Sequence, residues 1–240
     1  MTLFLTSSPC IIGAPRAILT TSNGFLDRLR AALPQHPRTL FVCANPEDPG
    51  GTDEFAQAFA GAFREAGMEL GEYTTLDYRN MDQTPHLVAQ SQLILLSGGH
   101  VPTQLAFFRE CRLKEALQSF HGVLMGISAG SMNAADEVYA QPENPGESID
   151  PDYPLFSPGL GLTDVQILPH YQQVKDYMLD GKRLYEDITF SHSYGHTFYA
   201  FPDGTYLYRD DHTYGIFGQC YRIRDGIMEQ ICYRNHWLPL

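Results

Sequence analysis

The chain has 240 residues, with 28 acidic and 16 basic side chains, and a formal net charge of −12 at pH 7. This length is enough for a large α/β domain with a buried core, and we expect a single domain over residues 1–240. Hydrophobic residues make up 43% and charged residues 18%, which excludes a disordered chain. The acidic balance argues against nucleic acid and anionic membranes as partners, because binding to either depends on Lys and Arg.

Cysteine usage and the N-terminal segment both bear on the cellular compartment. The five cysteines are scattered, and no two have C-x-x-C spacing, so we expect free thiols in a reducing compartment. The N-terminus has no basic residues ahead of its short apolar run, unlike a signal peptide. No stretch approaches the roughly 20 apolar residues of a membrane span. These features predict a cytoplasmic protein with no membrane partner.

The first two-thirds of the chain alternates short apolar runs with helical patterns. Strands are predicted at 39–44, 68–76, 92–96 and 123–127. A helix after the first strand is expected to begin at Thr52 or Asp53 and to end at Gly67. Another helix begins at Pro102, and helical residues follow Ser128 directly. This alternation predicts a mostly parallel sheet with helices on both faces.

The last third of the chain has a different pattern. From position 189 to 237, aromatic and β-branched residues are interrupted by Asp-Gly pairs at 203–204 and 225–226. Asp-Gly is a preferred pair for the two-residue turns of β-hairpins. We therefore expect the C-terminal part to add antiparallel strands to the edge of the sheet.

The sharpest motif is G-x-S-x-G, formed by Gly126, Ser128 and Gly130 between a predicted strand and a helix. A tight turn of this kind lifts a serine hydroxyl above the carboxyl edge of the sheet, and the glycines allow backbone to pass without Cβ clashes. The helix N-terminus also favours developing negative charge. The alternative is a glycine-rich turn with a serine that caps the helix. The strand before Ser128 and the helix after it favour a nucleophile.

Two further features are expected at the same sheet edge. Paired glycines, Gly98 and Gly99, follow the preceding strand, and a backbone N–H there could form an oxyanion hole with the N–H of Ala129. His170 follows the apolar run 165–168 and Pro169, so it too is expected at the end of a strand. It is the candidate general base among nine histidines.

His192 and His196 have the i, i+4 spacing that can suit a metal ion on a helix. The segment between them is turn-like, and no third ligand is obvious nearby. The sequence therefore predicts neither a metal nor another cofactor.

Four short motifs follow one another along the chain: SGGH at 97–100, GISAGS at 126–131, LPHY at 168–171 and FPDG at 201–204. Their order and spacing resemble the dipeptidase E family of serine peptidases, of which cyanophycinases are larger relatives. The resemblance implies a flavodoxin-like, class I glutamine-amidotransferase-like fold. It also implies metal-free cleavage of short peptides by a Ser-His-acid mechanism.

The resemblance assigns a role to each matching residue. Ser128 would be the nucleophile and His170 the general base, and Asp203 stands where relatives usually carry Glu as the acid that orients the histidine. Glu143, in the segment after the helix that follows Ser128, is the alternative acid. Asp203 is favoured because a hairpin holds a side chain more rigidly than a loop does. Gly99 and Ala129 carry over as oxyanion donors, and the candidate substrate contacts are Gly98, His100, Tyr171 and Glu143.

The charge around this predicted site departs from the pattern of the family. Members that select an N-terminal aspartate use Arg side chains near the site, but no Lys or Arg occurs here between Lys114 and Lys175. Residues 115–174 hold eight acidic residues instead. We therefore do not expect strict Asp-X specificity; an acidic rim favours a free α-amino group or a cationic side chain. The proline-rich loop 141–158 is the expected specificity element.

Three other functions stay open on the sequence alone. An α/β-hydrolase esterase orders its triad Ser, acid, His, and would use Asp203 or Asp211 followed by His236. A glutamine amidotransferase would carry Cys where this chain has Ser128. A non-catalytic binding protein could retain the fold. The expected partner is a short peptide substrate, and a homodimer is left open.

Overall fold

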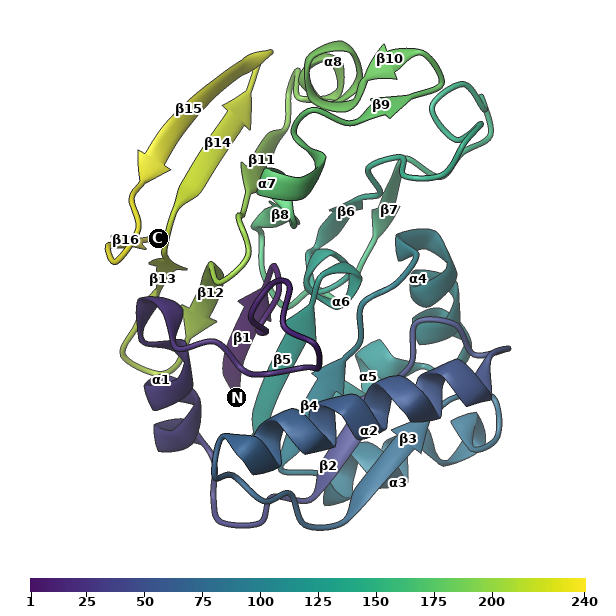
Figure 1. Cartoon of the computed structure of the whole chain (residues 1–240). Helices are drawn as coiled ribbons and strands as arrows, with labels where there is room; N and C mark the ends of the chain where they lie inside the picture. The colour runs from purple at the N-terminus through teal and green to yellow at the C-terminus, as the bar shows by residue number, and fades with distance from the viewer.

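The computed structural model describes residues 1–240 and contains a large sheet and a smaller one (Figure 1). The large sheet has five parallel strands: β1 (Thr2–Thr6), β2 (Thr39–Val42), β3 (Tyr73–Leu76), β4 (Leu93–Leu96) and β5 (Val123–Ile127). It is extended by three antiparallel strands: β12 (Tyr206–Arg209), β13 (Tyr214–Phe217) and β16 (Trp237–Pro239). The strand order is β16-β13-β12-β1-β5-β4-β2-β3.

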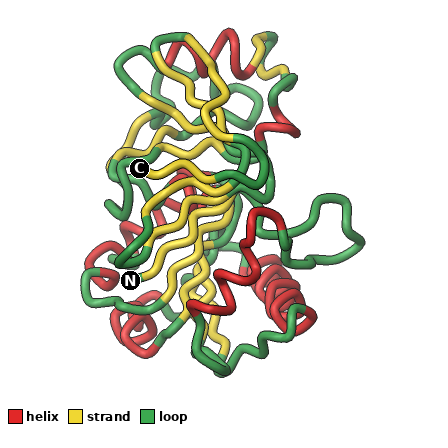
Figure 2. The backbone as a smooth tube through the Cα atoms, turned by 90° about the vertical axis from the view of Figure 1, so that its left-hand side faces the viewer, coloured by secondary structure: helices red, strands yellow, loops and turns green.

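Helices cover both faces of the large sheet, as Figure 2 shows from the side. One face packs against α1 (Phe25–Ala32) and α2 (Pro49–Glu65), and the other against α3 (Thr84–Gln90), α4 (Val101–Glu110) and α5 (Leu113–Leu117). Side chains of β5 alternate between the two cores: Met125 packs with α1 and α2, whereas Leu124 packs with the other three helices. The predicted α/β class, with a mostly parallel sheet between helices, is confirmed.

The smaller sheet has the order β15-β14-β11-β8, formed by β8 (Gln166–Leu168), β11 (Thr197–Ala200), β14 (Cys220–Arg224) and β15 (Ile227–Cys232). β8 and β11 are parallel, and β14 and β15 form an antiparallel hairpin. The hairpin turns at Asp225 and Gly226, which both have positive φ angles, as the Asp-Gly pair predicts. This sheet lies above the large one in Figure 1.

The remaining elements are short. Two strand pairs are β6 (Glu137–Tyr139) with β7 (Phe156–Pro158), and β9 (Met178–Leu179) with β10 (Lys182–Arg183). The short helices are η1 (Ser22–Gly24), η2 (Met81–Gln83), α6 (Ala129–Met132), α7 (Tyr171–Val174), the π-helix η3 (Leu184–Thr189) and α8 (Phe190–His192). None of the helices has both the length and the apolar character needed to cross a membrane.

Two element boundaries differ from the sequence predictions by three residues or more. Helix α2 begins three residues early, at Pro49, because the Asp48 side chain accepts a hydrogen bond from the Gly51 N–H at 2.9 Å and caps the helix there. Strand β3 begins at Tyr73 rather than at position 68, since its pairing with β2 starts only at Thr39.

The predicted hairpin at 203–204 is wrong in a way that matters for the site. β11 before this turn belongs to the smaller sheet, and β12 after it belongs to the large sheet. The turn at Asp203 therefore carries the chain from one sheet to the other. The sequence prediction also missed β1, which lies at the centre of the large sheet between β5 and β12.

Candidate active site

The candidate residues lie just beyond the carboxyl ends of strands in both sheets. Ser128 follows β5, and the glycines at 98–99 follow β4. His170 follows β8, and Asp203 follows β11. Hydrogen bonds join these positions, so the site lies where the two sheets meet.

Ser128 lies on a strained turn between β5 and α6. Its backbone has φ 51° and ψ −111°, an unfavourable conformation for a residue with a side chain. The Ser128 N–H donates to the carbonyl oxygens of Thr6 and Ser7, at 3.1 Å each, and this holds the turn against β1. A Cβ at Gly130 would lie 2.4 Å from the Leu96 carbonyl oxygen, so the chain needs glycine there. The strained conformation of Ser128 is therefore held in place by the backbone of residues 6–7 and by the close approach of Gly130 to Leu96.

Two backbone N–H groups beside Ser128 have no acceptor within the protein, those of Gly99 and Ala129. Gly99 has φ 154°, and a Cβ there would lie 2.5 Å from the Cβ of Ala44. A Cβ at Gly98 would lie 3.3 Å from the Cβ of Ser128. Because neither glycine has a Cβ, the chain that follows β4 can lie close to Ala44 and Ser128. Free N–H groups of this kind can stabilise an oxyanion.

His170 bridges Ser128 and Asp203. Its Nε2 lies 2.9 Å from the Ser128 Oγ, and its Nδ1 lies 2.8 Å from the Asp203 Oδ1. The His170 backbone has φ 59°, and its N–H donates to the Ser7 Oγ at 2.7 Å. The arrangement has the connectivity of a nucleophile, a base and an orienting acid.

Four donors surround the Asp203 carboxylate, whose side chain is 2% exposed. Besides His170, the Ser7 hydroxyl donates to Oδ1 at 2.6 Å, and the amides of Gln172 and Gln173 donate to Oδ2 at 2.7 Å each. Burial opposes the charge of Asp203, but the hydrogen bonds outweigh it and hold the pKa of this carboxyl below its ordinary value. Asp203 is therefore ionised at neutral pH.

The charge of Asp203 decides which nitrogen of His170 carries the proton. An ionised carboxylate only accepts hydrogen bonds, so Nδ1 of His170 must be the donor. In the neutral ring, Nε2 is then an acceptor that faces the Ser128 hydroxyl. This is the tautomer that can remove the serine proton.

A cavity of about 240 Å³ opens in front of Ser128 and His170. This volume is below the roughly 300–1,000 Å³ of pockets for drug-sized ligands, so the cavity has room for only a small part of a peptide. Its walls are mostly apolar, and no Lys or Arg lines it. The lining residues are Gly99, Val101, Ser128, Met132, Gln141, Pro142, Glu143, Pro169, His170, Val174, Tyr177 and Leu184.

The other candidate substrate contacts have different surroundings. His100 and Gly98 line a neighbouring hollow of about 360 Å³ on the other side of Gly99. The His100 ring bonds to the Thr103 hydroxyl at 2.7 Å and to the Glu147 carboxylate at 2.9 Å, which ties the 141–158 loop to the start of α4. Tyr171 packs its ring against Tyr185 and Tyr221 and does not line the cavity.

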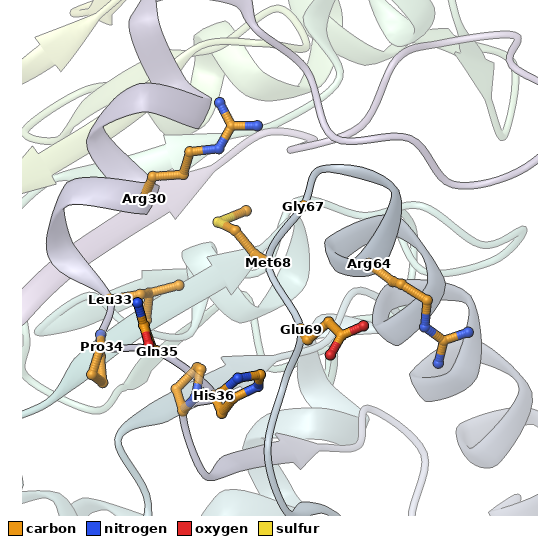
Figure 3. A pocket seen from close by; sticks show the side chains of 10 residues that line it. Arg30, Leu33, Pro34, Gln35, His36, Arg64, Gly67, Met68 and Glu69 are labelled. Carbon is orange, nitrogen blue, oxygen red and sulfur yellow. The ribbon is translucent and has the colours of Figure 1, made fainter.

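Other features of the molecule are separate from this site. His192 bonds to the Tyr139 hydroxyl, whereas His196 pairs with Glu137 and stacks on Phe156, so these histidines have different partners. A surface hollow of about 600 Å³ lies between the C-terminal ends of α1 and α2. In Figure 3 its two arginines, Arg30 and Arg64, lie on opposite sides, so their charges do not converge on one point.

Sequence reasoning missed the three side chains that hold Asp203, namely Ser7, Gln172 and Gln173. Ser7 follows the apolar run of β1, and reading that run as a strand would have placed it at the same sheet edge as Ser128. The two glutamines directly follow the LPHY motif, but Gln is common on solvated surfaces. No signal in the sequence separates these two from ordinary surface residues.

Comparisons with known proteins agree with this geometry. The sequence model described as peptidase family S51 matches residues 3–217. The fold is similar to that of a candidate peptidase E from Listeria monocytogenes EGD-e, solved at 1.5 Å, with a TM-score of 0.58 and 14% identity over 96% of this chain and 98% of the other. The comparison with curated proteins gives no match.

Proposed function

The chain belongs to peptidase family S51 and is a serine peptidase, and we propose that Ser128, His170 and Asp203 form its catalytic triad. The observation that carries this proposal is the continuous link from the Ser128 Oγ through both nitrogens of His170 to the Asp203 carboxylate. The chain order Ser, His, acid differs from the Ser, acid, His order of α/β-hydrolase esterases. The exposed His236, which that alternative requires, bonds to the backbone carbonyl of Arg234.

In the proposed mechanism, His170 Nε2 takes the proton of Ser128 as the hydroxyl attacks the scissile carbonyl. The N–H groups of Gly99 and Ala129 stabilise the tetrahedral oxyanion, and such a donor is worth about 2.7–4 kcal/mol. Protonated His170 then gives its proton to the leaving amine. Water hydrolyses the acyl-enzyme by the reverse route, with His170 again the base. The ionised Asp203 stabilises the imidazolium in both halves of the reaction.

Short peptides are the proposed substrates, because the cavity is small and the 141–158 loop lies beside it. We propose one domain over residues 1–240, supported by a single buried cluster that joins residues of both sheets, such as Leu40 of β2 and Ile167 of β8. We also propose a cytoplasmic location, in keeping with five cysteines that are all free.

Labelling with a fluorophosphonate probe tests the triad, since this reagent needs an activated serine. We expect the intact protein to be labelled, and Ser128→Ala and His170→Ala to lose labelling. His236→Ala is the matched control and should label at the rate of the intact protein. Labelling that survives Ser128→Ala, or that is lost only in His236→Ala, would overturn the proposal. No labelling of the intact folded protein would favour a binding protein instead.

A further inference from the structure

Glu143, an exposed residue, lines the cavity that holds Ser128 and His170. Its side chain forms no ion pair, and the hydrogen bond it takes part in uses its backbone N–H, which donates to Glu147. No Lys or Arg lines the cavity to balance its charge. Glu143 is therefore the one acidic residue in the lining of this largely apolar cavity.

The other acids of the same segment have partners or lie elsewhere. Both oxygens of Glu147 are engaged: one faces His100 and the Asn144 amide, and the other accepts the backbone N–H groups of residues 143 and 144. Asp136 and Glu137 line a different hollow beside His196. Asp150 and Asp152 are exposed, as Glu143 is, but they do not line the cavity. Among the acids of the predicted rim, Glu143 alone lines the cavity.

Glu143 is also not required to orient His170. The Nδ1 of His170 is occupied by Asp203 at 2.8 Å, and the Nε2 faces Ser128. Burial raises the pKa of the Glu143 carboxyl above its ordinary value and the neighbouring Glu147 carboxylate adds to this, although a hydrogen bond from the Val101 backbone N–H opposes it. A carboxylate whose partner is a single backbone N–H can still accept a charge-assisted hydrogen bond from a bound cation.

We propose that Glu143 binds a cationic nitrogen of the peptide substrate, either the free α-ammonium group or the end of a basic side chain. The inference depends on the proposed function, because it needs the scissile carbonyl to lie at Ser128. The apolar walls, including Val101, Met132 and Leu184, would pack against the aliphatic part of the same residue. Glu143 would then be a specificity residue and not a member of the triad.

The first experiment measures labelling of Ser128 by two alkyl fluorophosphonates of equal length, one ending in a methyl group and the other in an ammonium group. We expect the intact protein to react about tenfold or more faster with the ammonium probe, as for a charge-assisted hydrogen bond. Glu143→Gln should remove this preference while labelling by the neutral probe continues. Asp152→Asn removes an equal charge from the same loop outside the cavity, and it should keep the preference.

The outcomes separate the two proposals. Labelling by the neutral probe without any ammonium preference, or a preference that survives Glu143→Gln, would overturn the role of Glu143 and leave the triad standing. A preference lost equally in Asp152→Asn would assign the effect to the general charge of the loop, which also contradicts the proposal. If neither probe labels the folded protein, the triad and the inference both fail.

Peptide hydrolysis then separates the two sources of the cation. We compare kcat/KM for Leu-Ala, N-acetyl-Leu-Ala and N-acetyl-Lys-Ala in the intact protein and in Glu143→Gln. A Glu143-dependent loss of about tenfold on acetylation of Leu-Ala identifies the α-ammonium group. A Glu143-dependent gain for N-acetyl-Lys-Ala over N-acetyl-Leu-Ala identifies the side chain. Rates that respond to neither change would overturn the inference.

Discussion

The nucleophile and the acid of the proposed triad are held in place by two different kinds of structure. Ser128 is fixed by its own backbone: a strand, a strained turn and a helix that follow one another within a few residues. Asp203 is fixed by side chains from distant segments, since Ser7, His170, Gln172 and Gln173 all donate to it. Local backbone geometry therefore presents the nucleophile, whereas tertiary contacts decide the charge and position of the acid.

The largest expected effect comes from replacing the acid with its neutral isostere. Asp203→Asn should lower kcat by about 10⁴-fold, because an amide no longer fixes the tautomer of His170 or stabilises its charged form. Steady-state hydrolysis of a short peptide measures this, and Asp211→Asn, an exposed neighbour, is the control. A rate within tenfold of the intact protein would show that Asp203 is not the orienting acid.

A substitution in the tight turn that carries Ser128 should lower the stability of the folded protein. Gly130→Ala places a methyl group 2.4 Å from the Leu96 carbonyl oxygen, and relieving that clash should cost about 1–3 kcal/mol of unfolding free energy. Urea denaturation measures the loss. Gly61→Ala is the matched control, because its Cβ would meet nothing within 4 Å, and alanine in the middle of α2 should be neutral or stabilising. Equal stability for the two variants would contradict tight packing of the turn between β5 and α6.

Removing the Ser7 hydroxyl, which links the His170 backbone to the Asp203 carboxylate, should have a smaller effect. Ser7→Ala leaves the His170 N–H without its acceptor and Asp203 without one donor, and we expect kcat to fall about tenfold with little change in KM. Ser8→Ala is the control, because the Ser8 hydroxyl contacts Cys10 and not the triad. A rise in KM at constant kcat would indicate that Ser7 affects substrate binding instead of the position of His170.

The smallest expected effect is the pH dependence of stability that Asp203 contributes. Its pKa is lowered in the folded protein relative to the ordinary value of about 3.9. The contribution is therefore fully present above that value and is lost as the pH falls through the folded pKa. The difference in unfolding free energy between the intact protein and Asp203→Asn should be constant above about pH 5 and should shrink below pH 4. A difference that grows with acidity would contradict the low pKa.

Sequence patterns predicted the parallel part of the fold well. β5 has its predicted bounds, and β2 and β4 differ from theirs by no more than two residues. These strands are buried on both faces, so their sequences are continuous apolar runs that can be recognised without knowledge of the rest of the fold. The edge strand β3 and the start of α2 were misplaced because strand pairing and one capping side chain set their ends.

For the site, the turn at Ser128 and the candidate base follow from the sequence alone, because G-x-S-x-G and a histidine after a strand are short, local patterns. The sequence did not determine what surrounds Asp203, since the turn at 203–204 joins two sheets instead of closing a hairpin. The role of Glu143 was equally undecided: loop acids are alike in sequence, and only the fold shows that Glu147 is paired with His100 while Glu143 lines the same cavity as Ser128. The physical reason is common to both cases. The surroundings of each carboxylate depend on groups that are far apart in the chain, and these meet only in the folded molecule.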